Sequence, residues 1–226
     1  MKAQKVVVAC PACGHQQPEP ITAYSTVCKK CRKHYRVQEQ LQPAAPVVPA
    51  PRDTRRVQCF NCRAELDVPA AAQSTMCKKC SSHVDLRDYT ITNATSKNFK
   101  TRGRFVIEEG AYLFNTDTTA NEVILKGRFL GKLTAEKSLE VYNSSELKGT
   151  FTTNLLIIPS GHRFRWPDAL QLGGVDLAGE LVANIRAKQT VTLRSTARFF
   201  GDVEAAGLVI EPGAVFVGQA KIKPSP

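Results

Sequence analysis

Hydrophobic residues in the second half of the chain fall in short runs in which apolar and polar positions alternate. From residue 105 onward, β-rich runs of three to six residues recur between Gly, Asn, Ser or Pro, and no stretch of about eleven residues keeps helical periodicity. The runs align with a repeat of 15 to 19 residues, as in 190–207 and 208–222. Three short sides per repeat fit this spacing better than a sandwich, whose strands are longer. We therefore predict an all-β domain over 104–222, a right-handed parallel β-helix of roughly seven rungs.

Alternation within each run also predicts which side chains face the core of the β-helix. The stretch 171–189 is longer than its neighbours, which leaves its register open. The positions predicted to point inward and stack in ladders are Ile107, Val123, Leu125, Leu133, Leu139, Val141, Leu156, Ile158, Leu172, Leu177, Leu181, Val191, Leu193, Val203, Leu208, Ile210 and Val215.

The first half of the chain has a different pattern, in which cysteines replace large apolar residues. All eight Cys lie between Cys10 and Cys80, whereas nine of the ten Phe and the single Trp lie from Phe99 onward. The cysteines form four pairs with two residues between the members, and each cysteine of the first two pairs recurs 49 residues later. Neighbouring residues, including two adjacent lysines, follow the same offset, which indicates an internal duplication without gaps.

The cysteine spacing predicts two metal sites, one in each copy. A Cys-x2-Cys knuckle turns two thiolates towards one ion, and a second knuckle completes a tetrahedral set. A segment of about 25 residues with few large apolar side chains needs this binding energy to fold, so we expect two structural Zn²⁺ ions. Iron in the same ligand set, or disulfides, are the alternatives. The predicted ligands are Cys10, Cys13, Cys28 and Cys31 in the first copy, and Cys59, Cys62, Cys77 and Cys80 in the second.

Charge suggests two kinds of partner for these ribbons. The formal net charge is +11, but two tetrathiolate zinc centres of about −2 each lower it to about +7, so a polyanionic partner is not required. Lysines beside a knuckle balance the thiolates, and in that case the ribbons make protein contacts. The alternative is nucleic-acid binding, with Tyr24 and Tyr35 as rings for base stacking. The candidate nucleic-acid contacts are Lys29, Lys30, Arg32, Lys33, Lys78 and Lys79.

Composition also indicates the order of domains and the compartment. No apolar run approaches the roughly 18 residues that span a bilayer, and the apolar stretch at the start is too short for a signal peptide, so we expect no membrane span and a cytoplasmic location. Prolines between the ribbons predict an extended spacer. The predicted segments are zinc ribbon 1 (7–37), a proline-rich linker (38–56), zinc ribbon 2 (57–87), a second linker (88–103), the β-helix (104–222) and a tail (223–226).

The β-helical half resembles the bactofilins, bacterial cytoskeletal proteins that form filaments without nucleotide. The resemblance covers about 104–222. Duplicated ribbons precede it where many bactofilins carry a short membrane-targeting tail. The resemblance implies end-to-end assembly of the β-helix. It rests on runs such as Val106-Ile107-Glu108-Glu109-Gly110, Leu147-Lys148-Gly149-Thr150-Phe151 and Val209-Ile210-Glu211-Pro212-Gly213.

Physical reasoning on strand edges supports assembly as well. The end rungs of a parallel β-helix carry backbone groups without partners, so each end must be capped or must pair with another molecule. Large apolar residues near the two ends are candidates for self-assembly contacts: Phe105, Phe114, Phe216 and Ile222.

Nothing in the sequence suggests catalysis. Hexapeptide acyltransferases need a strict six-residue repeat and a catalytic His, whereas His162 is the single His of this half and follows a Ser-Gly turn. Phosphate loops, nucleophile elbows and paired acids are absent from the sequence. We therefore predict a non-enzymatic cytoskeletal scaffold that polymerises with itself and recruits protein partners through its ribbons. The alternative is an oligomeric nucleic-acid-binding adaptor.

Overall fold

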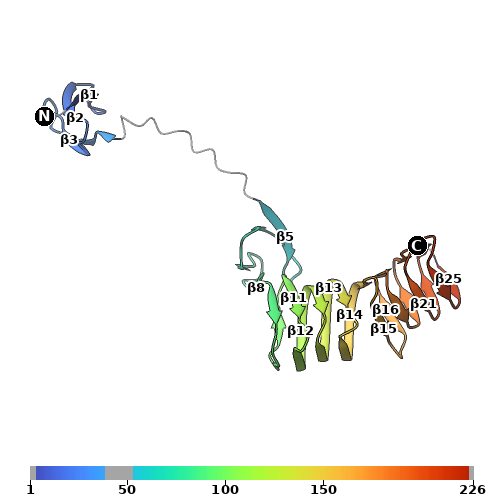
Figure 1. Cartoon of the computed structure of the whole chain (residues 1–226). Helices are drawn as coiled ribbons and strands as arrows, with labels where there is room; N and C mark the ends of the chain where they lie inside the picture. Colours follow the sequence, from blue (N-terminus) through green and yellow to red (C-terminus); the bar gives the residue numbers. More distant parts are fainter. Residues whose placement is uncertain (1–3, 39–52, 224–226) are drawn as a thin grey trace. The chain divides into compact units, whose positions relative to one another are not determined.

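The computed structural model describes residues 4–38 and 53–223. The chain divides into two compact units, Met1–Arg52 and Asp53–Pro226. The first unit holds one four-cysteine ribbon, and the second holds the other ribbon followed by the β-helix (Figure 1). Most of the predicted proline-rich linker and most of the predicted tail lie outside the described residues.

Each ribbon consists of two antiparallel hairpins. The first ribbon pairs β1 (Lys5–Ala9) with β2 (Gln16–Pro20) and β3 (Ser25–Val27) with β4 (His34–Arg36). The second ribbon pairs β5 (Thr54–Gln58) with β6 (Glu65–Pro69) and β7 (Ser74–Met76) with β8 (His83–Asp85). The two ribbons therefore repeat each other strand for strand, as the 49-residue offset predicts.

The ribbons bury few side chains. The first has a core of Val8, Cys10, Cys28, Tyr35 and Val37, and the second has a core of Cys59, Val68, Cys77, Val84 and Leu86. Two of the five members of each core are cysteines, so the sulfur clusters lie at the centre of the ribbons. Cores of this size supply little hydrophobic stabilisation.

The strands of the β-helix are short in most turns and long in three of them. They are β9 (Tyr89–Ile91), β10 (Phe99–Lys100), β11 (Arg104–Ile107), β12 (Tyr112–Leu125), β13 (Arg128–Val141), β14 (Glu146–Ile158), β15 (Arg163–Arg165), β16 (Leu170–Leu172), β17 (Gly174–Leu177), β18 (Glu180–Val182), β19 (Ile185–Ala187), β20 (Thr190–Leu193), β21 (Arg198–Phe200), β22 (Val203–Ala205), β23 (Gly207–Ile210), β24 (Val215–Val217) and β25 (Ala220–Ile222).

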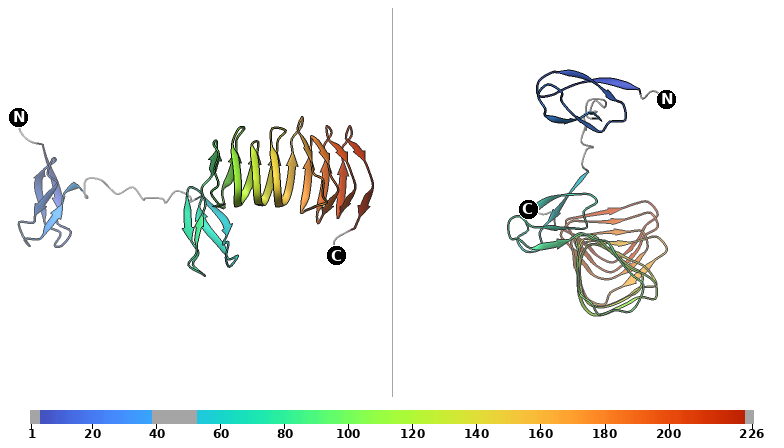
Figure 2. Two further views of the ribbon diagram at one scale, coloured as in Figure 1. Left: turned by 90° about the horizontal axis from the view of Figure 1, so that it is seen from below. Right: turned by 90° about the vertical axis from the view of Figure 1, so that its left-hand side faces the viewer.

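Parallel pairing of these strands winds the chain into a coil (Figure 2). The largest sheet runs through β9, β11, β12, β13, β14, β17, β20 and β23, so one side of the coil passes through eight successive turns. The remaining sides of the last four turns form two four-stranded sheets, β15-β18-β21-β24 and β16-β19-β22-β25. The prediction of an all-β chain with a parallel β-helix is therefore confirmed.

The core of the coil is a set of apolar ladders. One ladder on the largest sheet consists of Phe105, Val123, Leu139, Leu156, Val175, Val191 and Leu208, which stand in register 16 to 19 residues apart. Of the positions predicted to point inward, those up to Val203 are buried. Leu208 is half-buried and Ile210 is 47% exposed, because they lie in the last turn.

The structure differs from the sequence expectation at three places. Residues 89–100, expected to be a linker, form β9 and β10, which pair with β11 and β12 and add a turn before residue 104. The register of 171–189 is regular, since Leu172 pairs with Ala187 in the next turn. The longer repeat is instead the one from Leu156 to Val175, to which Leu172 belongs. Val215 points outward and is 42% exposed, whereas its neighbour Phe216 packs on the core.

Two corners of the coil pass so close to the preceding turn that no side chain fits. Gly149 has φ +108° and Gly201 has φ +137°, in the region that favours glycine. A Cβ at Gly149 would lie 2.1 Å from the carbonyl oxygen of Gly131, and one at Gly201 would lie 2.2 Å from that of Ala183. These corners fix the close stacking of successive turns.

Candidate metal centres and assembly surfaces

The eight cysteines gather into two clusters of four, as their spacing predicts. The Sγ atoms of Cys10, Cys13, Cys28 and Cys31 lie within 4.8 Å of one another, and so do those of Cys59, Cys62, Cys77 and Cys80. In both ribbons two sulfur pairs across the knuckles are 3.6 Å apart. A tetrahedron with metal–sulfur bonds of about 2.3 Å has edges of about 3.8 Å, so the clusters could each hold one ion.

All four knuckles share one backbone geometry. The first cysteine accepts a hydrogen bond from the N–H four residues later, as in Gly14 to Cys10 at 2.8 Å and Arg32 to Cys28 at 2.9 Å. The donor residue has a positive φ in every case, with Arg63 at 56° and Ser81 at 56° in the second ribbon. Three of these four residues are not glycine, so the sequence gives no sign of the left-handed turn. The turn directs both thiols of a knuckle to the same point.

Hydrogen-bond donors near the sulfur atoms favour thiolate at one cysteine of each cluster. The backbone N–H of Cys31 is the main cause that lowers the pKa of Cys28 to about 6. The hydroxyl and backbone N–H of Ser82 lower the pKa of Cys80 to about 6. In the same clusters, burial and hydrogen bonds to neighbouring thiols raise the pKa of Cys13 to about 12 and that of Cys62 to about 11. One cysteine of each ribbon therefore has a lowered pKa, and thiolate is the form that binds a metal ion.

The candidate nucleic-acid contacts are all exposed, whereas only one of the two predicted stacking rings is accessible. Tyr24 is 60% exposed, and the Arg36 guanidinium lies 5.9 Å from its ring centroid. Tyr35 is 6% exposed and belongs to the core of the first ribbon. The cations on the two second knuckles are Lys29, Lys30, Arg32 and Lys33 in the first ribbon, and Lys78 and Lys79 in the second.

Arg102 joins the second ribbon to the start of the β-helix. Only 7% of its side chain is exposed, and its Nε donates to the carbonyl oxygen of Gln58 at 2.6 Å. The ring centroid of Phe60 lies 3.9 Å from its Cζ. Glu136, on β13, forms an ion pair with its guanidinium. One cation therefore contacts the ribbon and the third turn of the coil together, a contact that sequence reasoning missed.

The end of the second ribbon also takes the place of an earlier turn beside residues 101–102. The Arg102 N–H donates to the carbonyl oxygen of Asp85 at 2.8 Å, across 17 residues, the length of one turn. The Asp85 carboxylate accepts hydrogen bonds from Arg87 at 2.8 Å and from the Tyr89 hydroxyl at 2.6 Å. Burial alone would raise the pKa of Asp85, but these bonds outweigh it and hold the pKa well below its usual range. The carboxylate thus ties the ribbon to the first turn.

Aromatic side chains cover the core at the first turn of the β-helix. Phe105 is fully buried, and the rings of Tyr89 and Phe99 lie over it with centroids 6.2 and 4.9 Å away. Phe114 lies in the second turn, where its ring packs 5.3 Å from that of Tyr112. Phe105 and Phe114, which the sequence predicts as self-assembly contacts, therefore lie in the second turn and not in the first.

The last turn of the β-helix presents open strand edges and apolar side chains. β23, β24 and β25 each end their sheet among the described residues. The Phe216 ring stacks on Phe199 with centroids 5.5 Å apart and planes 7° apart, so its outer face lies on the last turn. Ile210 and Ile222 are both 47% exposed. Phe216 and Ile222, which the sequence predicts as self-assembly contacts, therefore lie in the turn whose strands have an open outer edge.

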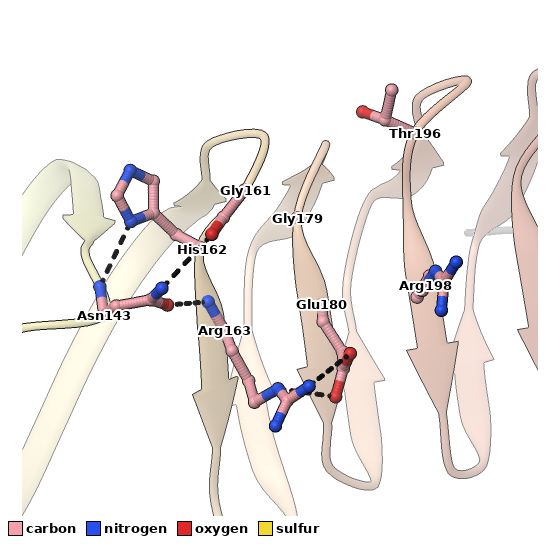
Figure 3. Close-up of a pocket in the computed structure, with 8 residues that line it drawn as sticks. All are labelled: Asn143, Gly161, His162, Arg163, Gly179, Glu180, Thr196 and Arg198. Atoms are coloured by element: carbon pink, nitrogen blue, oxygen red, sulfur yellow. Dashed lines mark hydrogen bonds and ion pairs between the residues drawn. The ribbon is translucent and has the colours of Figure 1, made fainter.

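His162 lies in a shallow hollow with contacts that are structural (Figure 3). Its Nδ1 accepts a hydrogen bond from the Asn143 N–H at 3.3 Å, and its ring lies 4.6 Å from that of Tyr142. The nearby Arg163 is paired with Glu180 at 2.8 Å. These contacts hold the turn at residues 159–162 against the preceding turn, as expected for a turn histidine.

Comparison with known proteins identifies one family. The family model of bactofilin, described as polymer-forming cytoskeletal, matches residues 82–165 and 169–221, which is more than half of the chain. No curated protein and no solved structure matches the chain. Among residues 4–38 and 53–223, none belongs to a helix with the length and apolar character that a membrane crossing requires.

Proposed function

Because the chain belongs to the bactofilin family of polymer-forming cytoskeletal proteins, we propose that it is a scaffold that polymerises without nucleotide through the end turns of its β-helix and recruits partners through two zinc ribbons. The observation that carries this proposal is the last turn, where three strand edges and the side chains of Ile210, Phe216 and Ile222 meet. A second molecule placed there would continue both the ladders and the strand pairing.

The type of contact supports the proposal that assembly does not need nucleotide. Strand edges and apolar side chains associate by backbone hydrogen bonds and burial of apolar surface, neither of which requires a phosphate group. The sequence contains no phosphate-binding loop that would couple assembly to hydrolysis.

Zinc is the ion that we assign to both clusters. Four thiolates in a closed tetrahedral set suit zinc, and no ligand position is left for water, so the ions would be structural. Metal binding would stabilise the second ribbon and, through Arg102, the start of the β-helix. Free thiols require a reducing compartment, which supports a cytoplasmic location.

Sedimentation and electron microscopy of the full chain test the polymerisation proposal. We expect wild-type protein to pellet as filaments with or without nucleotide, and Phe216→Arg and Ile222→Lys to stay in the supernatant because each places a charge on the last turn. Phe114→Arg is the matched control, because it puts the same charge on the flank of the second turn. Monodisperse wild-type protein at high concentration, or equal loss of filaments in the control, would overturn the proposal.

The exposed cations of the ribbons favour one second candidate, an oligomeric adaptor that binds nucleic acid. Binding to DNA or RNA that weakens steeply with added salt would support the adaptor. Absence of binding at low salt would remove it and leave protein recruitment.

A further inference from the structure

The outer face of the β1–β2 hairpin of the first ribbon carries apolar side chains beside one lysine. Cα pairing places Val7 opposite Pro18 and Lys5 opposite Pro20. Alternation turns Val6 and Val8 towards the ribbon core, so the side chains of Lys5 and Val7 point the other way. Val7 is 63% exposed and Pro18 is also exposed. We call Lys5, Val7, Pro18 and Pro20 the hairpin face.

The duplicated ribbon provides an internal comparison for this face. In the second ribbon the positions of Val7 and Pro18 are taken by Arg56 and Asp67, which pair in the same register. Their side chains are 79% and 72% exposed and form an ion pair of 3.5 Å. The same backbone therefore carries a self-satisfied polar pair in one ribbon and exposed apolar side chains in the other. Folding of the ribbon does not require the apolar pair, which points to binding.

Charge differs between the ribbons in the same sense. Residues 4–38 contain six Lys and Arg and one acidic residue, whereas the equivalent residues 53–87 contain six and four. The single acid, Glu19, is engaged by the Thr26 hydroxyl at 2.8 Å and by Gln17 at 2.7 Å. With a tetrathiolate zinc centre of about −2, the first ribbon keeps a positive balance of about +3, and Lys5 lies on the hairpin face itself.

We propose that the hairpin face of the first ribbon binds an acidic protein segment with apolar side chains. This inference rests on the proposed recruiting function and assigns it to the first ribbon. The segment would lie on the face and not extend the sheet at β2, because Pro18 and Pro20 lack backbone N–H groups. Its leucine-like side chains would cover Val7, and its carboxylates would meet the cations of the ribbon.

Other partners fit this surface less well. A second copy of the chain lacks the complementary charge, because residues 99–226 carry 16 basic and 13 acidic residues. Single-stranded nucleic acid binds by stacking successive bases on aromatic rings, and the hairpin face contains no aromatic side chain.

Binding of a labelled peptide to the full zinc-loaded chain tests the proposal. The probe is a short peptide in which leucines alternate with glutamates, and the comparison probes replace leucine by serine or glutamate by lysine. The double variant Val7→Arg, Pro18→Asp gives the first ribbon the pair that the second ribbon carries, so it preserves the fold. We expect this variant to bind the leucine–glutamate peptide at least about tenfold more weakly than wild type. The matched control, Arg56→Val in the second ribbon, should bind as wild type does.

Several results would overturn the proposal. Equal affinity of the double variant and wild type would exclude the hairpin face, and equal affinity for the serine probe would reduce the contact to charge alone. Tighter binding of an oligothymidylate than of the peptide would assign the ribbon to nucleic acid. Sedimentation of the same samples keeps the two proposals apart, because the double variant should form filaments as wild type does.

Discussion

Replacement of Arg102 by Met should weaken the docking of the second ribbon on the β-helix and thereby lower the stability of the ribbon. Methionine keeps the apolar part of the side chain and removes the guanidinium, which donates to the Gln58 carbonyl and lies over the Phe60 ring. The hydrogen bond from a charged donor contributes about 2 kcal/mol, the buried cation–π contact about 1 kcal/mol, and the pair with half-exposed Glu136 about 0.5 kcal/mol. Because these contributions share one group and do not add fully, we expect a loss of about 3 kcal/mol.

Hydrogen exchange of the full chain measures this loss locally. A change of about 3 kcal/mol corresponds to exchange faster by about a hundredfold in peptides that cover 53–87, with no change in peptides from 174–205. Lys100→Met is the matched control, because the Lys100 Nζ lies 4.8 Å from the same ring centroid but its side chain is exposed, and it should change exchange only slightly. Unchanged exchange in the Arg102 variant, or an equal effect of the control, would refute the docking argument.

Three further predictions concern the metal, a corner of the coil and a carboxylate. Cys28→Ser should reduce the native mass of the full chain by one zinc ion and leave the other bound, because the clusters are separate; loss of both would contradict this. Gly201→Ala should destabilise the β-helix by about 3 kcal/mol or more in denaturant unfolding, because its Cβ would meet the Ala183 carbonyl at 2.2 Å. Asp85→Asn should lower the stability of the docked ribbon by about 2 kcal/mol through its lost bonds to Arg87. Since the pKa of Asp85 is depressed in the folded chain, its contribution to stability is complete above the unfolded pKa of about 3.9 and is lost as the pH falls below that value. The difference in melting temperature between wild type and Asp85→Asn should therefore be the same at about pH 6 and about pH 8.

Local pattern was sufficient to predict the clusters and the fold type. Ligand spacing within a knuckle is set by a few residues, so the cysteine pairs predicted both groups of four. The period of the apolar ladders depends on strand alternation, which the sequence displays directly from Val123 to Val191. The bactofilin resemblance is confirmed by the family match.

Features that depend on contacts distant in sequence were not predictable. Residues 88–103 looked like a linker because only Tyr89, Ile91 and Phe99 among them are large and apolar. Their role depends on distant contacts: the rings of Tyr89 and Phe99 lie over Phe105, and Ile91 pairs with Ile107. The inward position in β24 was assigned one residue too early, because Val215 and Phe216 are both apolar and the alternation there is ambiguous. Docking through Arg102 joins residues 44 positions apart and has no local signal.

Diffraction from aligned filaments of the full chain tests end-to-end stacking of the β-helix most directly. If the last turn of one molecule pairs with an end turn of the next, the strand spacing of about 4.8 Å must lie along the filament axis. Eight turns then give an axial repeat of about 38 Å, or twice that if neighbouring molecules alternate in direction. A strand spacing perpendicular to the axis, or closed rings without an axial 4.8 Å reflection, would contradict assembly through the end turns.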